Sequence, residues 1–413
     1  MPVDFVRIPP RARVPEVSHP SILVWALLLC LMLGASALLT IFVWPAGKPT
    51  NTAGFWFRAA VLPVLTWGLL LACRFAWTYV RINAALATNR TADDIEKQRH
   101  DLSSQPLAVL GHAWRFSSSE EENSVEDLVD GKTKLCPASS QVRPNTDVMA
   151  RWLEIPGKRF YGGNTRTEHA RQTEVCEWLL NELMRDLAPQ ILQLPRRVSM
   201  SVDFCIDTVL QPATWVARLQ SLLKEKFPSL RVEVNPATRE LSLFHADSWH
   251  DGARPDVVRL LVAVQLRKAA SEVLANGVAE AASMLLVGSP AVAGQMNDKP
   301  ALRIHRPARG ASGNVADVLK LAVRWGRTSF DETGTTWRTG LGKDASRTIR
   351  SSCRFGHLMR PVNVDETVGN AGAARAWLAT TLAAANAALM NEPQLVIAQE
   401  GDDLVALVCQ KQT

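Results

Sequence analysis

Two long apolar stretches near the N-terminus constrain this chain more than any other feature of its sequence. Residues 22–44 contain no charged side chain, and residues 59–80 contain one, Arg74. A helix needs about 20 apolar residues to cross the hydrocarbon core of a bilayer. An arginine near the end of such a span can extend its charged group to the lipid headgroups. The two stretches therefore predict a transmembrane hairpin.

The hairpin sets the predicted domain organisation. We expect a tail at residues 1–20, a transmembrane hairpin at 21–81, a polar linker at 82–104 and a soluble domain at 105–413. A cleaved signal peptide is the alternative for the first stretch, because three arginines precede it. Its apolar run is longer than the apolar region of a signal peptide, which has roughly 7–15 residues. A second apolar stretch also follows directly.

Basic residues are more frequent outside the hairpin than in the loop between its two stretches. The outer segments carry Arg7, Arg11, Arg13, Arg81, Arg90, Lys97 and Arg99, and the loop carries Lys48 and Arg58. Lysine and arginine favour the cytoplasmic side of a membrane. This distribution predicts that both termini and the soluble domain are cytoplasmic.

Charge and cysteine content exclude several classes of protein. The net charge of +6 is dispersed, with no basic run interleaved with aromatic residues, so we expect no nucleic-acid partner. Part of the excess flanks the spans, where it can contact membrane lipid. The seven cysteines lack paired spacing, which is typical of reduced thiols. The eight histidines lack metal-ligand spacing and no phosphate loop is complete, so we predict neither a metal nor a cofactor.

The soluble part alternates between strand-like and helix-like patterns, which predicts an α/β fold with a largely parallel sheet. Strands are expected at 106–114, 196–207, 230–234, 241–245, 282–288 and 301–307, and a closing hairpin at 393–411 is expected at a sheet edge. Helices are expected at 166–191, 213–227, 256–275, 313–326 and 371–389. Ser119 and Asn314 are the expected N-caps of two helices. Among the tryptophans, Trp114, Trp152, Trp249 and Trp337 are expected on the surface, and Trp178 and Trp377 in the core.

The last 50 residues carry the most specific pattern of the chain. A glycine-rich turn at 369–374 precedes a helix of small residues and the closing hairpin. This arrangement resembles the C-terminal part of thiolase-like (β-ketoacyl synthase-like) domains, and the resemblance implies a layered α/β fold. In active members the turn carries a histidine in a pattern like G-H-x-x-G-A. Here Asn370 stands where that histidine would be.

The resemblance also implies a nucleophilic cysteine at an elbow between a strand and a helix. Cys205 lies within a predicted strand, and Cys176 lies on a helix face. Cys353 is followed four residues later by His357, which with Arg354 can supply the positive charge that a reactive thiolate needs. Cys353 and His357 are therefore the candidates for catalysis, and a loop thiol without function is the alternative.

A membrane hairpin followed by a degenerate thiolase-like domain also resembles bacterial proteins associated with type VI secretion effectors. Members of that group serve as effector adaptors or immunity proteins. This implies a non-catalytic protein-binding domain, anchored in the bacterial inner membrane, whose partner is a secreted effector or toxin. The alternative is a membrane-associated acyl-transfer enzyme with Cys353 or Cys205 as its nucleophile.

Overall fold

The computed structural model describes residues 9–412, apart from 17–18, 297–300, 353–355 and 357–358. The chain divides into two compact units, one from Val3 to Arg99 and the other from His100 onward. The N-terminal unit contains α1 (Ile22–Val43), α2 (Ala53–Trp56), a π-helical turn (Phe57–Val61) and most of α3 (Leu62–Ser103).

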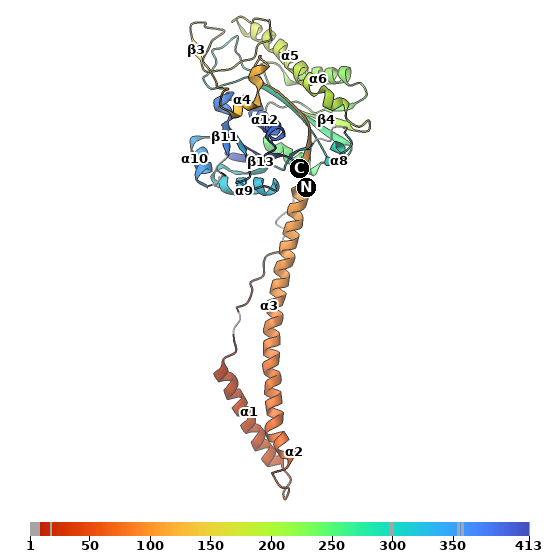
Figure 1. Ribbon diagram of the computed structural model, residues 1–413, viewed down its shortest axis with the longest axis vertical. Coiled ribbons are helices and arrows are strands. Elements are labelled where there is room, and N and C mark those ends of the chain that lie inside the picture. The colour runs from red at the N-terminus through yellow and green to blue at the C-terminus, as the bar shows by residue number, and fades with distance from the viewer. Residues whose placement is uncertain (1–8, 17–18, 297–300, 353–355, 357–358, 413) are drawn as a thin grey trace. The chain divides into compact units, whose positions relative to one another are not determined.

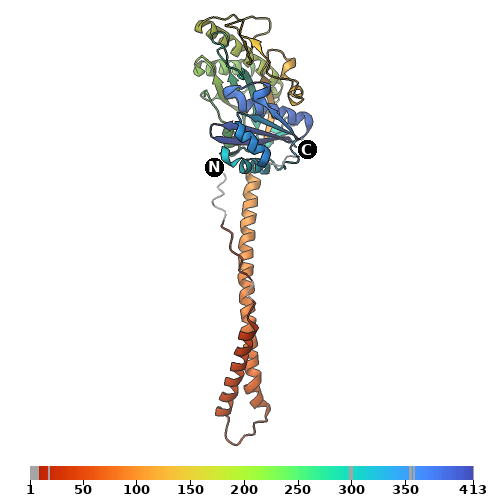
Figure 2. The ribbon, with the colours of Figure 1, turned by 90° about the vertical axis from the view of Figure 1, so that its left-hand side faces the viewer.

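Two helical segments of the N-terminal unit are long and apolar enough to cross a bilayer. α1 reaches a mean hydropathy of 2.6 with none of its most apolar window buried, and Ala53–Ser103 reaches 1.8 with 11% buried. α1 runs back along the start of α3 (Figure 2), where the indole N–H of Trp67 donates to the carbonyl oxygen of Trp25 at 2.9 Å. Length and composition thus agree with the predicted hairpin.

The second apolar helix does not end where its apolar stretch ends. Residues 82–104, expected as a linker, continue α3 as regular helix up to Ser103. Near its start, Pro63 has no N–H to donate to the carbonyl of Ala59, and the helix widens there into the π-helical turn. The polar half of α3 is therefore a helical extension of the apolar half.

The N-terminal tail contacts this polar half of α3. The backbone N–H of Ala12 donates to Asn89 Oδ1 at 2.7 Å, and Asn89 Nδ2 donates back to the carbonyl of Ala12 at 3.0 Å. The guanidinium of Arg11 lies 2.8 Å from the carboxylate of Asp93. The segment before the first apolar stretch thus lies against the segment that follows the second.

The C-terminal unit is built on one mixed sheet with the strand order β11-β10-β12-β13-β8-β1-β7-β6-β4-β5, and with β9 paired to β13. Its strands are β1 (Leu107–Arg115), β4 (Ser199–Asp207), β5 (Arg231–Val234), β6 (Val257–Gln265), β7 (Ala281–Gly288), β8 (Leu302–Ile304), β9 (Ala308–Ala311), β10 (Thr335–Thr339), β11 (Arg360–Asn363), β12 (Gln394–Glu400) and β13 (Asp403–Lys411). β2 (Ala138–Ser139) and β3 (Asp147–Val148) form a separate pair.

The sheet consists of two halves with the same topology. The first half runs β1-β7-β6-β4-β5 and the second runs β8-β13-β12-β10-β11. In each half the first two neighbouring pairs are antiparallel and the last two are parallel. The halves join where β1 and β8 pair antiparallel, with Leu107 opposite Ile304.

Helices cover both faces of each half (Figure 1). The principal ones are α5 (Thr165–Leu192), α6 (Pro212–Lys226), α9 (Val315–Trp325), α10 (Lys343–Ser352) and α12 (Arg375–Met390), and the short ones are α4 (Val125–Val129), α7 (Ala246–Asp251), α8 (Pro290–Ala293) and α11 (Val364–Thr367). α12 is buried along nearly its whole length and packs on strands of both halves. α5 and α6 cover the other face of the first half, and α9 that of the second.

Close packing explains two sequence features of these layers. The small side chains of α12 let strands of both halves approach one helix, which becomes the centre of the main core cluster. Gly111 in β1 allows α5 to approach the sheet, because a Cβ at this position would lie 2.7 Å from Leu187 Cδ2. The result is the layered α/β fold that the sequence predicts.

Several local predictions are wrong. Residues 256–275, predicted as a helix, form β6 followed by a loop, because a strand buried on both faces has a continuous apolar sequence like that of a buried helix. Residues 241–245, predicted as a strand, end in a 3₁₀ turn (Leu243–His245) that leads into α7. The closing hairpin β12–β13 lies in the middle of the sheet, where β13 also pairs with β8 and β9.

The sheet is also less parallel than predicted. Among the described residues, its strand pairs are six antiparallel and four parallel. Ser124, rather than Ser119, caps α4, where its side chain accepts from Asp127 N. Asn314 precedes α9 without a side-chain cap bond. Trp249 and Trp337 are buried instead of exposed, whereas Trp377 is buried as predicted.

Candidate functional site

The glycine-rich turn before α12 is the place where the sequence resemblance locates a catalytic histidine. Asn370 occupies that place, and both its backbone and its side chain are used in building the turn. Its N–H donates to Gly277 O at 2.7 Å and its carbonyl accepts from Ala279 N at 3.0 Å. Its Oδ1 accepts from Gly372 N at 2.9 Å. An amide does not titrate at neutral pH, so Asn370 cannot exchange protons as an imidazole does.

Hydrogen bonds through Gln265, the last residue of β6, hold the turn in place. Gln265 Oε1 accepts from the backbone N–H of Ala373 at 2.9 Å, and its Nε2 donates to Asp207 at 3.0 Å. Gly372 has φ +48°, and a Cβ there would lie 2.1 Å from Gln265 Oε1. The turn before α12 thus contacts a fixed amide in a space that leaves no room for a side chain at position 372.

The described cysteines of the C-terminal unit divide into one exposed thiol and three buried ones. Cys205 lies in β4 with no exposed surface, and burial raises the pKa of its thiol to about 12. Burial likewise raises the pKa of Cys409 to about 12 and that of Cys176 well above its usual value. These three thiols are protonated at neutral pH and unsuited to nucleophilic attack. Cys136 is exposed. Cys353 and His357, the catalytic candidates, lie outside the described residues.

The duplicated topology shows which helix of the first half corresponds to α12, and so where an elbow between a strand and a helix would lie in that half. α12 lies between β11 and β12, so its counterpart in the first half is the six-residue α7, between β5 and β6. The rings of Trp249 on α7 and Trp377 on α12 stack at 5.2 Å. α7 follows His245 and begins at Ala246, and its sequence contains no cysteine.

His245 belongs instead to a hydrogen-bonded cluster around Asp203 of β4. Its Nε2 lies 3.4 Å from Asp203 Oδ2, which also accepts from Trp249 Nε1 at 2.9 Å. Asn235 Nδ2 donates to the other oxygen at 2.8 Å. Burial alone would raise the pKa of Asp203, but the bonds from His245, Asn235 and Trp249 hold it below its usual value. Within the described chain, the His245 ring makes no hydrogen bond to a cysteine or a hydroxyl group.

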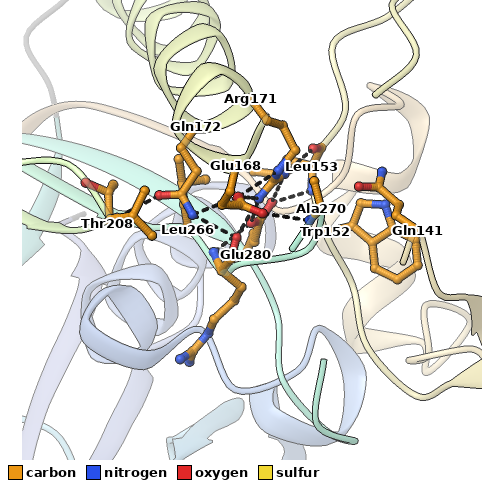
Figure 3. A network of polar contacts seen from close by, with 12 residues as sticks. Gln141, Trp152, Leu153, Glu168, Arg171, Gln172, Thr208, Leu266, Ala270 and Glu280 are labelled. Carbon is orange, nitrogen blue, oxygen red and sulfur yellow. Dashed lines mark hydrogen bonds and ion pairs between the residues drawn. The ribbon is translucent and has the colours of Figure 1, made fainter. Parts of the chain in front are cut away.

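A buried polar network joins α5 to the first half of the sheet (Figure 3). Arg171 donates to Glu168 at 3.0 Å and to Glu280 at 2.5 Å, and none of these three side chains is more than 1% exposed. Gln172 donates to Glu168 at 2.9 Å and accepts from Val209 N at 2.8 Å.

Both carboxylates of this network also accept backbone N–H groups. Glu168 accepts from Ala270, and Glu280 accepts from Arg267 and Leu153. With its charges paired and its oxygens hydrogen-bonded, the network fixes α5 to two loops, a structural role. The sequence analysis missed it, although charged residues 168 and 171 stand on the apolar face of the predicted helix.

A cavity of about 600 Å³ opens beside this network, between residues 117–138 and residues 150–154. Its wall carries acidic and basic side chains in similar number, namely Glu121, Glu122, Asp127, Glu154, Lys132, Lys134 and Arg151. Among the described residues, no group of three histidine, cysteine, aspartate or glutamate side chains is placed to hold a metal ion. The cavity is therefore the candidate binding site of the unit.

Arg151 and Glu154 organise the cavity. The Arg151 guanidinium lies 3.0 Å from Glu122, donates to the carbonyl of Lys134 at 3.1 Å, and stacks 5.5 Å above the Phe116 ring. Glu154 Oε1 accepts from Trp152 Nε1 at 3.0 Å and from Gln141 Nε2 at 2.7 Å. Of the tryptophans predicted on the surface, Trp152 is the one that lines this cavity.

Comparison with solved structures identifies the fold. An oxazolomycin ketosynthase domain from Streptomyces albus superposes with a TM-score of 0.51 at 12% identity, over 75% of this chain and 76% of that one. A type II polyketide ketosynthase in complex with its acyl-carrier protein superposes with a TM-score of 0.50 at 12% identity, over 74% of this chain and 99% of that one. No protein-family model and no curated protein matches the sequence. The C-terminal unit therefore has the thiolase-like ketosynthase fold that the sequence predicts, and identity this low shows the fold alone.

Proposed function

We propose that this chain is a non-catalytic, membrane-anchored protein-binding domain. The observation that carries the proposal is the turn at Asn370. Where the resemblance places a histidine, the chain has an amide whose oxygen closes the turn through Gly372 N at 2.9 Å. A side chain held in this way supports the backbone and offers neither a general base nor a cation.

The buried thiols support the same proposal. Cys205, the alternative nucleophile, has no exposed surface, and its pKa is raised to about 12. Acyl transfer needs a thiolate that a substrate can reach. The burial of Cys176, Cys205 and Cys409 thus supports a role for the domain surface and its location rather than for these thiols.

The tail contacts support the proposed topology. Ala12 precedes the first apolar stretch, Asn89 follows the second, and the two residues exchange hydrogen bonds of 2.7 and 3.0 Å. Such contacts require both segments on one side of a bilayer, which is what a two-span hairpin gives. The excess of lysine and arginine on these segments favours the cytoplasmic face of a bacterial inner membrane.

We further propose that the partner is a type VI secretion effector or toxin, and that the chain serves as its adaptor or immunity protein. This proposal rests on the resemblance of the hairpin and domain architecture. A pull-down tests it: the tagged full chain is crosslinked in membranes of a bacterium that expresses such a system, extracted in detergent and analysed by mass spectrometry. Residues 1–104 alone serve as the control for binding through the hairpin. We expect an effector or toxin enriched with the full chain.

Two outcomes would contradict the proposal. One is a full chain that enriches no protein beyond those recovered with residues 1–104. The other is acyl transfer, detected as the mass of an acyl group added to one cysteine after incubation with an acyl-thioester analogue. Loss of that adduct in Cys353→Ala or Cys205→Ala would identify the nucleophile.

A further inference from the structure

We infer that the cavity beside Arg151 is a groove for an extended peptide segment of the partner protein, and that a lysine or arginine of this segment reaches Glu154 and Trp152. The inference rests on the proposed function, since it names where and how the protein partner binds. Three properties of the cavity support it: a free backbone edge, a second wall with unpaired backbone donors and an uncompensated carboxylate.

The backbone of residues 149–153 is hydrogen-bonded along one edge. The N–H of Arg151 donates to Val278 O at 3.0 Å, and its carbonyl accepts from Glu280 N at 2.9 Å. The N–H of Leu153 donates to the Glu280 carboxylate at 2.8 Å. Alternate residues thus bond to the segment that leads into β7, as residues of a strand do.

The opposite edge of this segment is free up to Glu154, whose N–H donates to Ser118 Oγ at 2.7 Å. Among the residues that the structure describes, the backbone N–H and C=O groups of Ala150 and Trp152 have no hydrogen-bond partner. Both residues line the cavity, whereas residues 276–280 on the bonded side do not. The free edge is partly exposed at Trp152, whereas Ala150 is only 3% exposed. Unpaired strand edges accept added strands, and extended peptides bind to proteins in this way.

The second wall of the cavity also has backbone donors without an acceptor. In the described part of the chain, the backbone N–H groups of Leu135 and Cys136 have no acceptor. Arg151 Nη2 donates to the carbonyl of Lys134 at 3.1 Å and so joins the two walls. A peptide lying between these walls meets backbone donors on one side and both donors and acceptors on the other.

Charge indicates which peptide fits. Two of the three cations on the wall are already paired: Arg151 with Glu122 at 3.0 Å, and Lys132 with Asp127 at 3.2 Å. The charged groups of the wall that lack an ion-pair partner among the described residues are Glu121, Glu154 and Lys134. The net charge of these three unpaired groups is therefore one negative charge, which favours a basic side chain over an acidic one.

Glu154 is the group that such a side chain would contact. Its Oε1 is fixed by Trp152 Nε1 and Gln141 Nε2, while its Oε2 makes no hydrogen bond within the described residues. A lysine or arginine placed here gains a charge-assisted hydrogen bond to the carboxylate and contact with an indole ring. Because the carboxylate is held in place beforehand, little side-chain entropy is lost on binding.

A phage-displayed library of random dodecapeptides, selected against the full chain in detergent, tests the inference. We expect enriched peptides to carry a lysine or arginine flanked by β-branched residues. The synthetic form of the best peptide should bind Glu154→Gln and Trp152→Leu about tenfold more weakly than the unaltered chain. Glu225→Gln on the exposed face of α6 is the matched control and should leave the affinity unchanged. Glu121→Gln at the exposed rim is a further variant, with an expected weakening of about two- to threefold.

Binding of the peptide as an added strand can be tested separately, through the amide groups of its backbone. N-methylation of alternate amides of the peptide should abolish binding, whereas methylation of the amides between them should be tolerated, because successive N–H groups of a strand point to opposite sides. A library that enriches no peptide would overturn the inference. So would an enriched peptide that is acidic, that binds Glu154→Gln and Trp152→Leu as tightly as the unaltered chain, or that tolerates every N-methylation.

The pull-down separates this inference from the proposed function. If Glu154→Gln and Trp152→Leu capture the partner as well as the unaltered chain does, the groove is not the binding site of the partner, and the protein-binding function stands. If membranes yield no partner although peptides bind the groove, the function is wrong. A dimer in sedimentation experiments that Trp152→Leu dissociates, without peptide binding, would assign the groove to a second copy of the chain and overturn the inference.

Discussion

The guanidinium of Arg171 lies 2.5 Å from the carboxylate of Glu280, and solvent reaches neither side chain. The pair connects the segment that leads into β7 to α5, and Glu280 is also the residue that fixes Arg151 and Leu153 at the border of the cavity. The shape of the candidate binding site therefore depends on an ion pair that itself lies outside the cavity.

Removing one partner of this pair should destabilise the unit strongly. Arg171→Met leaves two buried carboxylates without a cation, and breaking a buried pair in this way costs about 3–5 kcal/mol. Thermal unfolding of the full chain in detergent, followed by circular dichroism, measures the loss. Arg185→Met removes an exposed pair with Glu182 on the same helix and should change stability by less than about 1 kcal/mol. Equal losses in the two variants would contradict the structural role of the network.

The turn before α12 should tolerate no side chain at position 372. Gly372→Ala places a Cβ 2.1 Å from Gln265 Oε1, at φ +48°. We expect a loss of about 2–4 kcal/mol, the sum of backbone strain and the displaced amide. Gly401→Ala is the matched control, because its φ of +62° is similar and its surroundings are open. That variant should lose about 1–2 kcal/mol, and a loss as large as that of Gly372→Ala would contradict the close contact with Gln265.

Two histidines with lowered pKa values, the buried His305 and the partly exposed His250, should make the C-terminal unit sensitive to mild acid. Burial, aided by nearby arginines, lowers the pKa of His250 to about 3 and that of His305 to about 4. In the unfolded chain both titrate near 6.5, so the unfolded state takes up protons first as the pH falls. The stability they contribute is complete above about pH 6.5 and is lost progressively below it, by up to about 1.4 kcal/mol per pH unit for each histidine.

Melting temperatures recorded between pH 7.5 and 5 measure this effect. His250→Gln and His305→Gln should each make the pH dependence shallower. His169→Gln on the exposed surface of α5 should leave it unchanged. A melting temperature that stays constant down to pH 5 would contradict the lowered pKa values of both rings.

The thiols should react in an order that follows their burial. Cys136 is exposed, whereas Cys176, Cys205 and Cys409 are fully buried. With iodoacetamide at pH 8, peptide mass spectrometry should show rapid modification of Cys136, and modification of the other three only after denaturation. Rapid modification of Cys205 in the native chain would restore it as a candidate nucleophile.

The sequence predicts well those parts of the fold whose pattern of apolar residues is typical of one kind of element. α5 shows a clear amphipathic pattern, the closing hairpin is marked by the turn at Gly401 and Asp402, and the apolar stretches of the transmembrane hairpin stand out by length. The run at 257–265 misleads because a strand in a sheet with both faces covered is apolar throughout, as a buried helix is. The central position of β12 and β13 depends on pairing with β8 and β10, which local pattern does not encode.

The candidate site is less predictable than the fold. Asn370 could be located because its glycine neighbours preserve the pattern of the turn. The cavity could not, since its walls come from loops whose conformation depends on contacts such as Arg151 with Glu122. Of its residues, the sequence analysis singled out Trp152, as one of four tryptophans expected on the surface.

The pairing of β1 with β8 has a consequence for biosynthesis. Leu107 is translated long before Ile304, its partner in the sheet, so the joint between the halves closes only when most of the domain has left the ribosome. The apolar stretches precede both strands, and on the proposed topology they enter the membrane first. This chain would then be tethered to its bilayer while the domain is still unfolded, and folding would take place at the membrane surface.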